Sequence, residues 1–450
     1  MVVVETPPRR TRHYEPVDEL VLRTAGDVSP AFLRARALVE PIVESVMAPR
    51  PVRPTLVGSA EGAIGRLLLT IPAYAVGSRP LADAYRHLLR KLPPVVGIVA
   101  LTHESVQDDV TAWVTESGRA PSSSIIAAPD HLNFSVWAED GYVAVTDADG
   151  ATYLLEPFAF PRYGDSLVAD LVANATDLRN TQAPLYFQGG NVLIGDDFFL
   201  IGADYPANSL DYVMQGVLTP APGESAVALV RRLYGEYLDT ERELRYVAAT
   251  IPVPEQRERT IRLDGQEWTE VLHLGNRPGT AQPLFHIDMF ISLAGRAQDG
   301  RYRLLVGDPR RAADLLGLPL YPHAMAEIFD NVAGTLERTG FAVHRNPLPL
   351  VYLDDERTRQ RRWYFATSNN ALVETSPRGG GIAYLPTYGH GSWPSLAATD
   401  RANRALWEQL GFSTVALGDF HPFAENLGAL HCISKYLARS PGADVRRTLP

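Results

Sequence analysis

Residues 185–195 (LYFQGGNVLIG) and 196–204 (DDFFLIGAD) decide the fold of this chain. Both are short apolar runs that meet at a turn, and this pattern predicts a β-hairpin. Residues 225–238 then have the apolar spacing of an amphipathic helix, and residues 244–253 return as an apolar strand. Together they predict a unit made of two strands, a helix and a third strand.

The same ββαβ unit recurs along the chain. The matching segments are 284–294, 301–309, 323–340 and 341–351, then 361–374, 381–389, 401–411 and 412–419, with looser versions at 66–74, 80–92 and 95–104 and at 135–147, 151–160 and 167–178. Residues 428–438 form a last strand with no helix after it, which we expect to complete the first unit. Five such units predict a closed, pseudo-symmetric α/β ring. The alternative is two doubly wound domains joined near residues 215–225 or 253–258.

The N-terminal region differs from the rest. Residues 1–28 are rich in proline, arginine and acidic residues and predict a loosely ordered arm. Ser29 and Pro30 then provide helix-start signals, and a one-sided apolar spacing continues to Val46. We therefore divide the chain into an arm and helix at residues 1–50 and a single domain at residues 51–450.

Composition restricts the classes of function. The 450 residues are 46% hydrophobic and 21% charged, which is typical of a globular protein rather than a disordered one. The net charge of −10 attracts neither nucleic acid nor anionic lipid, and it suits a small cationic substrate. No apolar stretch is long enough to predict a membrane span. The sequence leaves open whether the chain forms a homo-oligomer.

Cysteine usage is equally restrictive. Cys432 is the only cysteine, which excludes an intramolecular disulfide and a zinc site built from several thiolates. We therefore expect a reducing, cytoplasmic compartment.

Polar residues interrupt the apolar first strand of each unit, where unpaired polar groups are costly. They are Glu139 and Asp140, Gln188 and Asn191, His286 and Asp288, Asn369 and Asn370, and His431 and Cys432. Their positions in the units correspond. In a ring they would converge at one end of its axis, where a small polar ligand could satisfy them.

Three of these motifs have both a chemical and a structural interpretation. His286 and Asp288 are two residues apart, so on a strand they share one face and suit acid/base work beside a cation, although a structural pair or two metal ligands are alternatives. Cys432 follows a turn with polar neighbours, which fits a nucleophile as well as an inert buried thiol. Gly189 and Gly190 allow a close approach of backbone to a ligand, but a plain turn or bulge explains them too.

In this order, the motifs resemble the pentein superfamily of guanidino-group-modifying enzymes, which includes arginine and agmatine deiminases and amidinotransferases. WAEDGY at residues 137–142 is similar to the W-x-R-D-x-G element of agmatine deiminases, and FQGGN at 187–191 to their E-G-G element. HIDMFISLAG at 286–295 resembles the H-x-D element, and GALHCIS at 428–434 the terminal strand with the nucleophile. The resemblance covers residues 66–437.

The resemblance implies a five-bladed ββαβ propeller with a central Cys-His-carboxylate site and no metal or cofactor. It makes Cys432 the nucleophile, His286 the general acid/base, and Asp140 and Asp288 the carboxylates that bind a guanidinium. Trp137, Gln188 and Asn191 are implied as further substrate-binding residues. The expected function is a deiminase-type hydrolase that releases ammonia and a ureido product through a covalent intermediate on Cys432. The alternatives are an amidinotransferase and a catalytically weak binding protein.

The chain also departs from the family pattern. Gln188 stands where the deiminases have glutamate, Asn191 where arginine deiminases have aspartate, and Glu139 where agmatine deiminases have arginine. A neutral amide cannot stabilise an imidazolium or a guanidinium as a carboxylate does. These changes leave open an altered substrate, a slower enzyme, or a site in which Glu139 takes over the missing charge.

Overall fold

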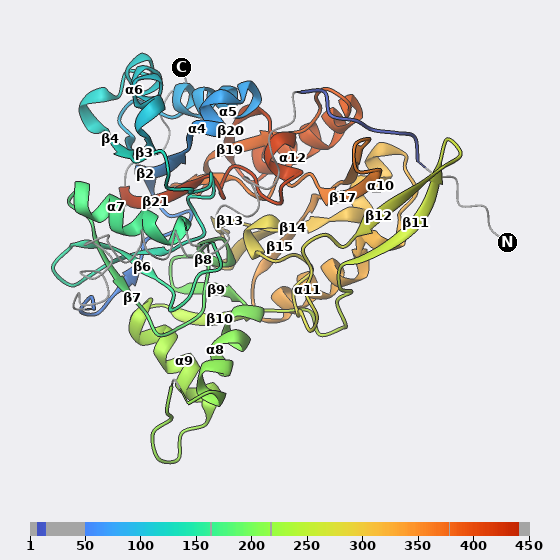
Figure 1. Cartoon of the computed structure of the whole chain (residues 1–450). Helices are drawn as coiled ribbons and strands as arrows, with labels where there is room; N and C mark the ends of the chain where they lie inside the picture. The colour runs from blue at the N-terminus through green and yellow to red at the C-terminus, as the bar shows by residue number, and fades with distance from the viewer. Residues whose placement is uncertain (1–6, 15–49, 163, 217, 378, 441–450) are drawn as a thin grey trace.

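The computed structural model describes residues 7–14, 50–162, 164–216, 218–377 and 379–440. The helix predicted after Pro30 lies outside these residues. Within the described part the chain has a mixed α/β fold whose strands form six small sheets (Figure 1).

Four of the sheets repeat the predicted ββαβ order. Their elements are β5 (Val143–Thr146), β6 (Thr152–Glu156), α7 (Val168–Ala175) and β7 (Arg179–Gln182); β8 (Val192–Ile194), β9 (Phe198–Gly202), α8 (Asp204–Met214), α9 (Ala226–Tyr237) and β10 (Glu243–Val247); β13 (Ile291–Arg296), β14 (Tyr302–Asp308), α10 (Pro309–Leu316), α11 (Ala326–Arg338) and β15 (Ala342–Pro347); and β18 (Leu372–Thr375), β19 (Gly381–Thr387), α12 (Ala397–Gln409) and β20 (Phe412–Asp419). In each sheet the first two strands are antiparallel and the third is parallel to the second. The short strand β1 (Thr55–Leu56) extends the first of them.

The fifth sheet joins the two ends of the domain. It contains β2 (Ala63–Ile71), β3 (Gly97–His103) and β4 (Ser124–Ala128), with helices α4 (Ala73–Gly77), α5 (Arg79–Lys91) and α6 (Gln107–Glu116) in the connections. The last strand, β21 (Ser434–Ser440), pairs antiparallel with β2. The prediction that the terminal strand completes the first unit is therefore confirmed.

The sixth sheet was not predicted. It has the order β11 (Arg257–Leu263), β12 (Gln266–Leu272), β17 (Gln360–Phe365) and β16 (Leu350–Asp355), and it is built from two hairpins inserted between units. The prediction of one strand over residues 361–374 is wrong, because β17 pairs with β16 and β12 while β18 pairs with β19. The apolar pattern runs through both strands and does not mark the break between them.

Capping residues explain the bounds of the helices where the sequence provides them. Asp308 accepts a hydrogen bond from the backbone N–H of Arg311, and Pro309 occupies the first turn of α10. The helix ends at Gly317, whose φ of 61° is a left-handed conformation that glycine adopts without strain.

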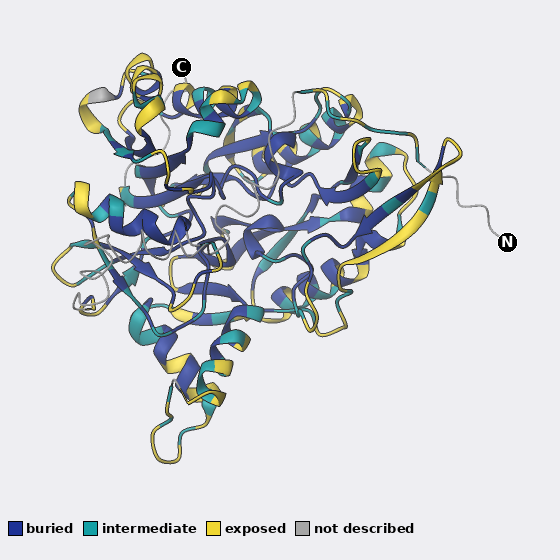
Figure 2. Cartoon of the chain, viewed as in Figure 1, coloured by how far each residue is buried: buried dark blue, intermediate teal, exposed yellow. Residues whose placement is uncertain are grey.

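Most helices lie on the outside with the sheets toward the middle of the molecule, but the hairpin of β11 and β12 lies at the edge and β11 is largely exposed (Figures 1 and 2). The largest buried apolar cluster includes Ala60, Val247, Leu272 and Tyr436, so it spans both boundaries considered for a two-domain chain. In the described residues no helix is long and apolar enough to cross a bilayer.

The described part of the arm, residues 7–14, lies against the domain. Arg9 forms ion pairs with Asp264 and Glu356, and Arg12 forms one with the buried Glu425. The helical turn α13 (His421–Ala424) ends next to Glu425. This part of the arm is thus tied to the body by charge rather than loose.

Candidate active site

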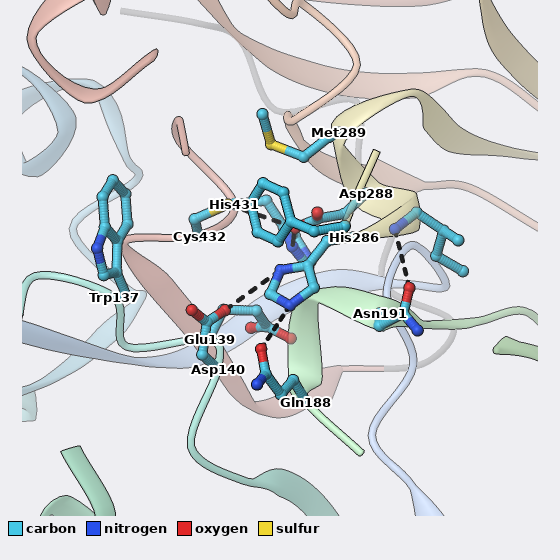
Figure 3. Close-up of polar contacts among 12 residues, drawn as sticks. Trp137, Glu139, Asp140, Gln188, Asn191, His286, Asp288, Met289, His431 and Cys432 are labelled. Atoms are coloured by element: carbon cyan, nitrogen blue, oxygen red, sulfur yellow. Dashed lines mark hydrogen bonds and ion pairs between the residues drawn. The ribbon is translucent and has the colours of Figure 1, made fainter. Parts of the chain in front are cut away.

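A pocket of about 510 Å³ holds most of the predicted site residues. Asp140, His286 and Cys432 line it together with Gln188 and Trp137 (Figure 3). Asp288 does not line the pocket, but its Oδ2 lies 3.6 Å from Cys432 Sγ. Residues separated by almost 300 positions therefore converge on one place, as the corresponding positions in the units predicted.

These residues lie in short turns that precede the strands, and not in the strands themselves. Gly189–Asn191 and Ile287–Met289 each form a single 3₁₀ turn, and β13 starts only at Ile291. The prediction that His286 and Asp288 share one face of a strand is wrong, although both still point into the site. In a turn, backbone N–H and C=O groups form hydrogen bonds with one another locally. A strand at the centre of the molecule would instead need a neighbouring strand for its hydrogen bonds.

Gly189 and Gly190 are required by the protein itself. A Cβ on Gly189 would lie 1.9 Å from the carbonyl oxygen of Glu139, and a Cβ on Gly190 would lie 2.6 Å from His286 Nδ1. Contacts this short are not possible, so only glycine lets this turn pack against Glu139 and the imidazole.

His286 is held by the amide of Gln188. Gln188 Oε1 accepts hydrogen bonds from His286 Nε2 at 2.7 Å and from the Tyr205 hydroxyl at 3.1 Å. Because Nε2 carries the proton, Nδ1 of the neutral ring is unprotonated; it has no hydrogen-bond partner and lies 3.6 Å from Asp140 Oδ1. Burial lowers the pKa of His286, against the opposing effect of Asp140 and Asp288. The ring is thus a neutral base with its lone pair free.

Asp140 is fixed by an arginine that sequence reasoning missed. Arg162 donates to Asp140 Oδ2 at 2.6 Å and to Asp165 Oδ2 at 2.5 Å, and it lines the same pocket. Asp165 in turn accepts from the backbone and hydroxyl of Ser135. Asp140 therefore keeps one bound oxygen and one free oxygen, Oδ1, which has no hydrogen-bond partner.

Cys432 is positioned by Asn370. Asn370 Oδ1 accepts hydrogen bonds from the backbone N–H groups of His431 and Cys432, and its Nδ2 donates to Sγ at 3.1 Å. Burial raises the pKa of the Cys432 thiol well above its usual value, and the carboxylates of Asp288 and Asp140 raise it further. The thiol is therefore protonated in the empty site.

His431 lies next to Asp288. Its Nδ1 lies 2.8 Å from Asp288 Oδ2. Burial alone lowers the pKa of His431, but the carboxylates of Glu139 and Asp288 outweigh that effect and raise it. The other oxygen of Asp288, Oδ1, is buried without a hydrogen-bond partner.

Glu139 does not replace the charge missing at Gln188. It is buried beneath the site, outside the pocket lining, and its Oε1 accepts from Lys435 Nζ at 2.7 Å. Burial raises the pKa of Glu139 although Lys435 opposes this. The pair links the turn after Trp137 to the terminal strand β21.

The remaining predicted residues have different positions. Asn191 lies outside the pocket lining, where its amide pairs with Gln282 and accepts from the backbone of Ile287, so it positions the turn that carries Asp288. Asn369 bonds to Ser292 and Leu305 instead of the site. Trp137 packs tightly over Gly428, whose Cβ would lie 2.2 Å from the indole ring. The described residues contain no group of three or more histidine, cysteine, aspartate or glutamate side chains placed to hold a metal ion.

Comparison with known proteins supports the fold. No family model and no curated protein sequence matches this chain. Among solved structures, an agmatine deiminase from C. jejuni superposes with a TM-score of 0.54 at 11% identity over 86% of this chain and 96% of its own. The agmatine deiminase of Enterococcus faecalis superposes with a TM-score of 0.51 at 12% identity over 87% and 100%.

The chain therefore has the fold of these agmatine deiminases. The resemblance found in the sequence is confirmed at the level of the fold.

The buried Glu139–Lys435 pair provides a test of how the site is held. Lys435→Met leaves the Glu139 carboxylate buried without its cation, and we expect it to destabilise the protein by about 3–5 kcal/mol. Urea unfolding followed by circular dichroism measures this. The double variant Glu139→Gln/Lys435→Met removes both charges and should recover most of the loss. A single variant as stable as the wild type would contradict the role of the pair.

The Gln188–His286 hydrogen bond provides a second test. A base works only when deprotonated, so activity falls as the pH drops through the pKa of His286. Gln188→Glu places a negative charge beside the ring and stabilises the imidazolium, which raises that pKa. We expect the acidic limb of the kcat/KM profile to move up by about one pH unit. Gln188→Met, which adds no charge, should leave no such upward shift. An unmoved limb in the glutamate variant would exclude His286 as the titrating base.

Proposed function

We propose that this chain is a cysteine-dependent hydrolase of a guanidino compound, of the deiminase type. The observation that carries the proposal is a set of three buried acceptors without hydrogen-bond partners. Asp140 Oδ1 and His286 Nδ1 belong to residues of the pocket lining, and Asp288 Oδ1 belongs to a residue behind it whose Oδ2 lies 3.6 Å from Cys432 Sγ. A planar cation with several N–H groups matches such a set, and a guanidinium is the common biological group of that kind.

We further propose that the five ββαβ units surround a common axis as the blades of a propeller. The pairing of β21 with β2 supports this arrangement, because it joins the last strand of the chain to the first unit. The site residues would then lie at the axis, which accounts for their convergence from all five units.

In the first half-reaction, bound guanidinium lowers the pKa of the nearby thiol because its positive charge offsets Asp140 and Asp288. Cys432 Sγ attacks the guanidino carbon while the thiol proton passes to His286 Nδ1. The tetrahedral adduct collapses when His286 returns that proton to a terminal nitrogen, which leaves as ammonia. The substrate remains bound to sulfur as an amidino-thioether.

In the second half-reaction, His286 takes a proton from water, and the hydroxide attacks the same carbon. The adduct collapses with cleavage of the C–S bond, and His286 gives the departing sulfur the proton that it took from water. The remaining hydroxyl proton of the adduct passes to solvent, where the released ammonia takes it up as ammonium. The product is a ureido compound. This proposed reaction uses no oxidant, reductant or metal ion. A reaction that depends on a single free thiol suits a reducing compartment such as the cytoplasm.

The nucleophile and the reaction are tested together. We expect Cys432→Ser to lower turnover by more than about 10³-fold, because a hydroxyl does not become an anion at neutral pH as a thiol can. The assay measures ammonia and ureido product from a panel of guanidines without added amine. Unchanged thermal unfolding of the variant controls for folding. If product forms only when an amine acceptor is added, the enzyme is an amidinotransferase; if the wild type binds guanidines without turnover, it is a binding protein.

The role of Asp140 is tested against its neighbour Asp165. Both carboxylates bind Arg162, but only Asp140 lines the pocket. Asp140→Asn removes a charged acceptor from a buried cation, and we expect kcat/KM to lose about 2–5 kcal/mol of transition-state stabilisation. Asp165→Asn perturbs the same arginine without facing the substrate, so its loss should be clearly smaller. Equal losses in both variants would make Asp140 a structural residue.

A further inference from the structure

The mouth of the pocket contains an arginine with no role in the reaction described above. Arg277 lines the pocket and is exposed, whereas His286 and Cys432 at the other end are 1% and 2% exposed. The gradient of burial places the reacting groups at the bottom and Arg277 at the entrance. A substrate with its guanidine at Cys432 directs its other end toward Arg277.

Arg277 sits on a loop that is fixed on both sides. Before it, the backbone N–H of Gly275 donates to Gln256 Oε1 at 2.8 Å, and Asn276 Nδ2 donates to the carbonyl of Pro254 at 3.0 Å. After it, Asp204 accepts from the hydroxyl of Thr280 and from the backbone N–H of Ala281. The loop that carries Arg277 at the pocket is therefore held in place by hydrogen bonds on both sides.

The charges at the mouth favour an anion. The structure gives the side chain of Arg277 no hydrogen bond or ion pair with any described residue, while Arg162, the other arginine of the pocket lining, is paired with two carboxylates. Asp204 also lies at the mouth, but each of its oxygens already accepts a hydrogen bond from the loop, and burial raises the pKa of Asp204. The free charge at this end is positive.

We propose that Arg277 binds a carboxylate at the far end of the substrate, so that the preferred substrate is a guanidino acid rather than a guanidino amine. Arginine binds carboxylates through two parallel hydrogen bonds, which suits a group at the end of a flexible chain. The same charge repels the terminal ammonium of a guanidino amine. This inference rests on the proposed function for the identity of the guanidine.

The test compares 4-guanidinobutanoate with agmatine, which are similar in length but end in a carboxylate and an ammonium. We expect the wild type to prefer the acid. Arg277→Ala should raise the KM for the acid by about 10–100-fold, the value of a charge-assisted pair, with little change in kcat. Arg277→Glu should shift the preference toward agmatine. Arg357→Ala, at an exposed arginine in the turn between β16 and β17, is the matched control and should change neither constant.

Binding measurements separate this inference from the proposed reaction. Titration calorimetry on the Cys432→Ala background measures affinity for both compounds without turnover. Preferential binding of the acid that is lost with Arg277→Ala supports the inference even if no guanidine is hydrolysed. Preference of the wild type for agmatine, or equal weakening of both compounds by Arg277→Ala, would overturn it.

Discussion

Three buried carboxylates lie at this site or beneath it, and each is paired with a basic side chain. Asp140 binds Arg162, Asp288 binds His431, and Glu139 binds Lys435. A carboxylate without a partner in such a place would lose several kcal/mol of solvation or become protonated. The pairs of Asp288 and Glu139 each reach the terminal segment, over 143 and 296 residues of sequence, so the site forms only when the strands next to it are assembled. The polar centre and the fold therefore depend on each other.

The same pairs determine the reactivity of the thiol. Asp288 Oδ2, which pairs with His431, lies 3.6 Å from Cys432 Sγ, and the carboxylates of Asp288 and Asp140 raise the pKa of the thiol. In the proposed reaction, a guanidinium bound beside these carboxylates would reverse that effect because it brings its own positive charge. The thiolate would then form only when the substrate is in place.

The recurring units, the closure of the first sheet by the last strand, and the convergence of Asp140, His286 and Cys432 could all be predicted from the sequence. The hydrophobic period indicates the units, and the corresponding positions of the polar residues within the units indicate the site. The hydrophobic period does not indicate which strands pair with each other. The residues of β17 were therefore assigned to the unit that contains β18. Arg162 was missed because its partner Asp140 is 22 residues away and no local pattern connects them. Asn191 was predicted to bind substrate because its turn resembles the family motif. In the structure its amide faces Gln282 inside the fold.

Gln188 now has a physical explanation that links it to substrate choice. As an amide it accepts a hydrogen bond from His286 Nε2 and leaves the ring neutral, where a glutamate would favour the imidazolium. Because Gln188 stands where the deiminase pattern has a glutamate, the deep end of the pocket has one negative charge fewer than that pattern would give it. A less negative deep end, together with the free cation Arg277 at the mouth, lowers the electrostatic gain from a substrate with two positive ends. If Arg277 binds a carboxylate as proposed, the pocket as a whole suits a guanidine whose second group is an anion, because the two ends of such a molecule meet opposite charges.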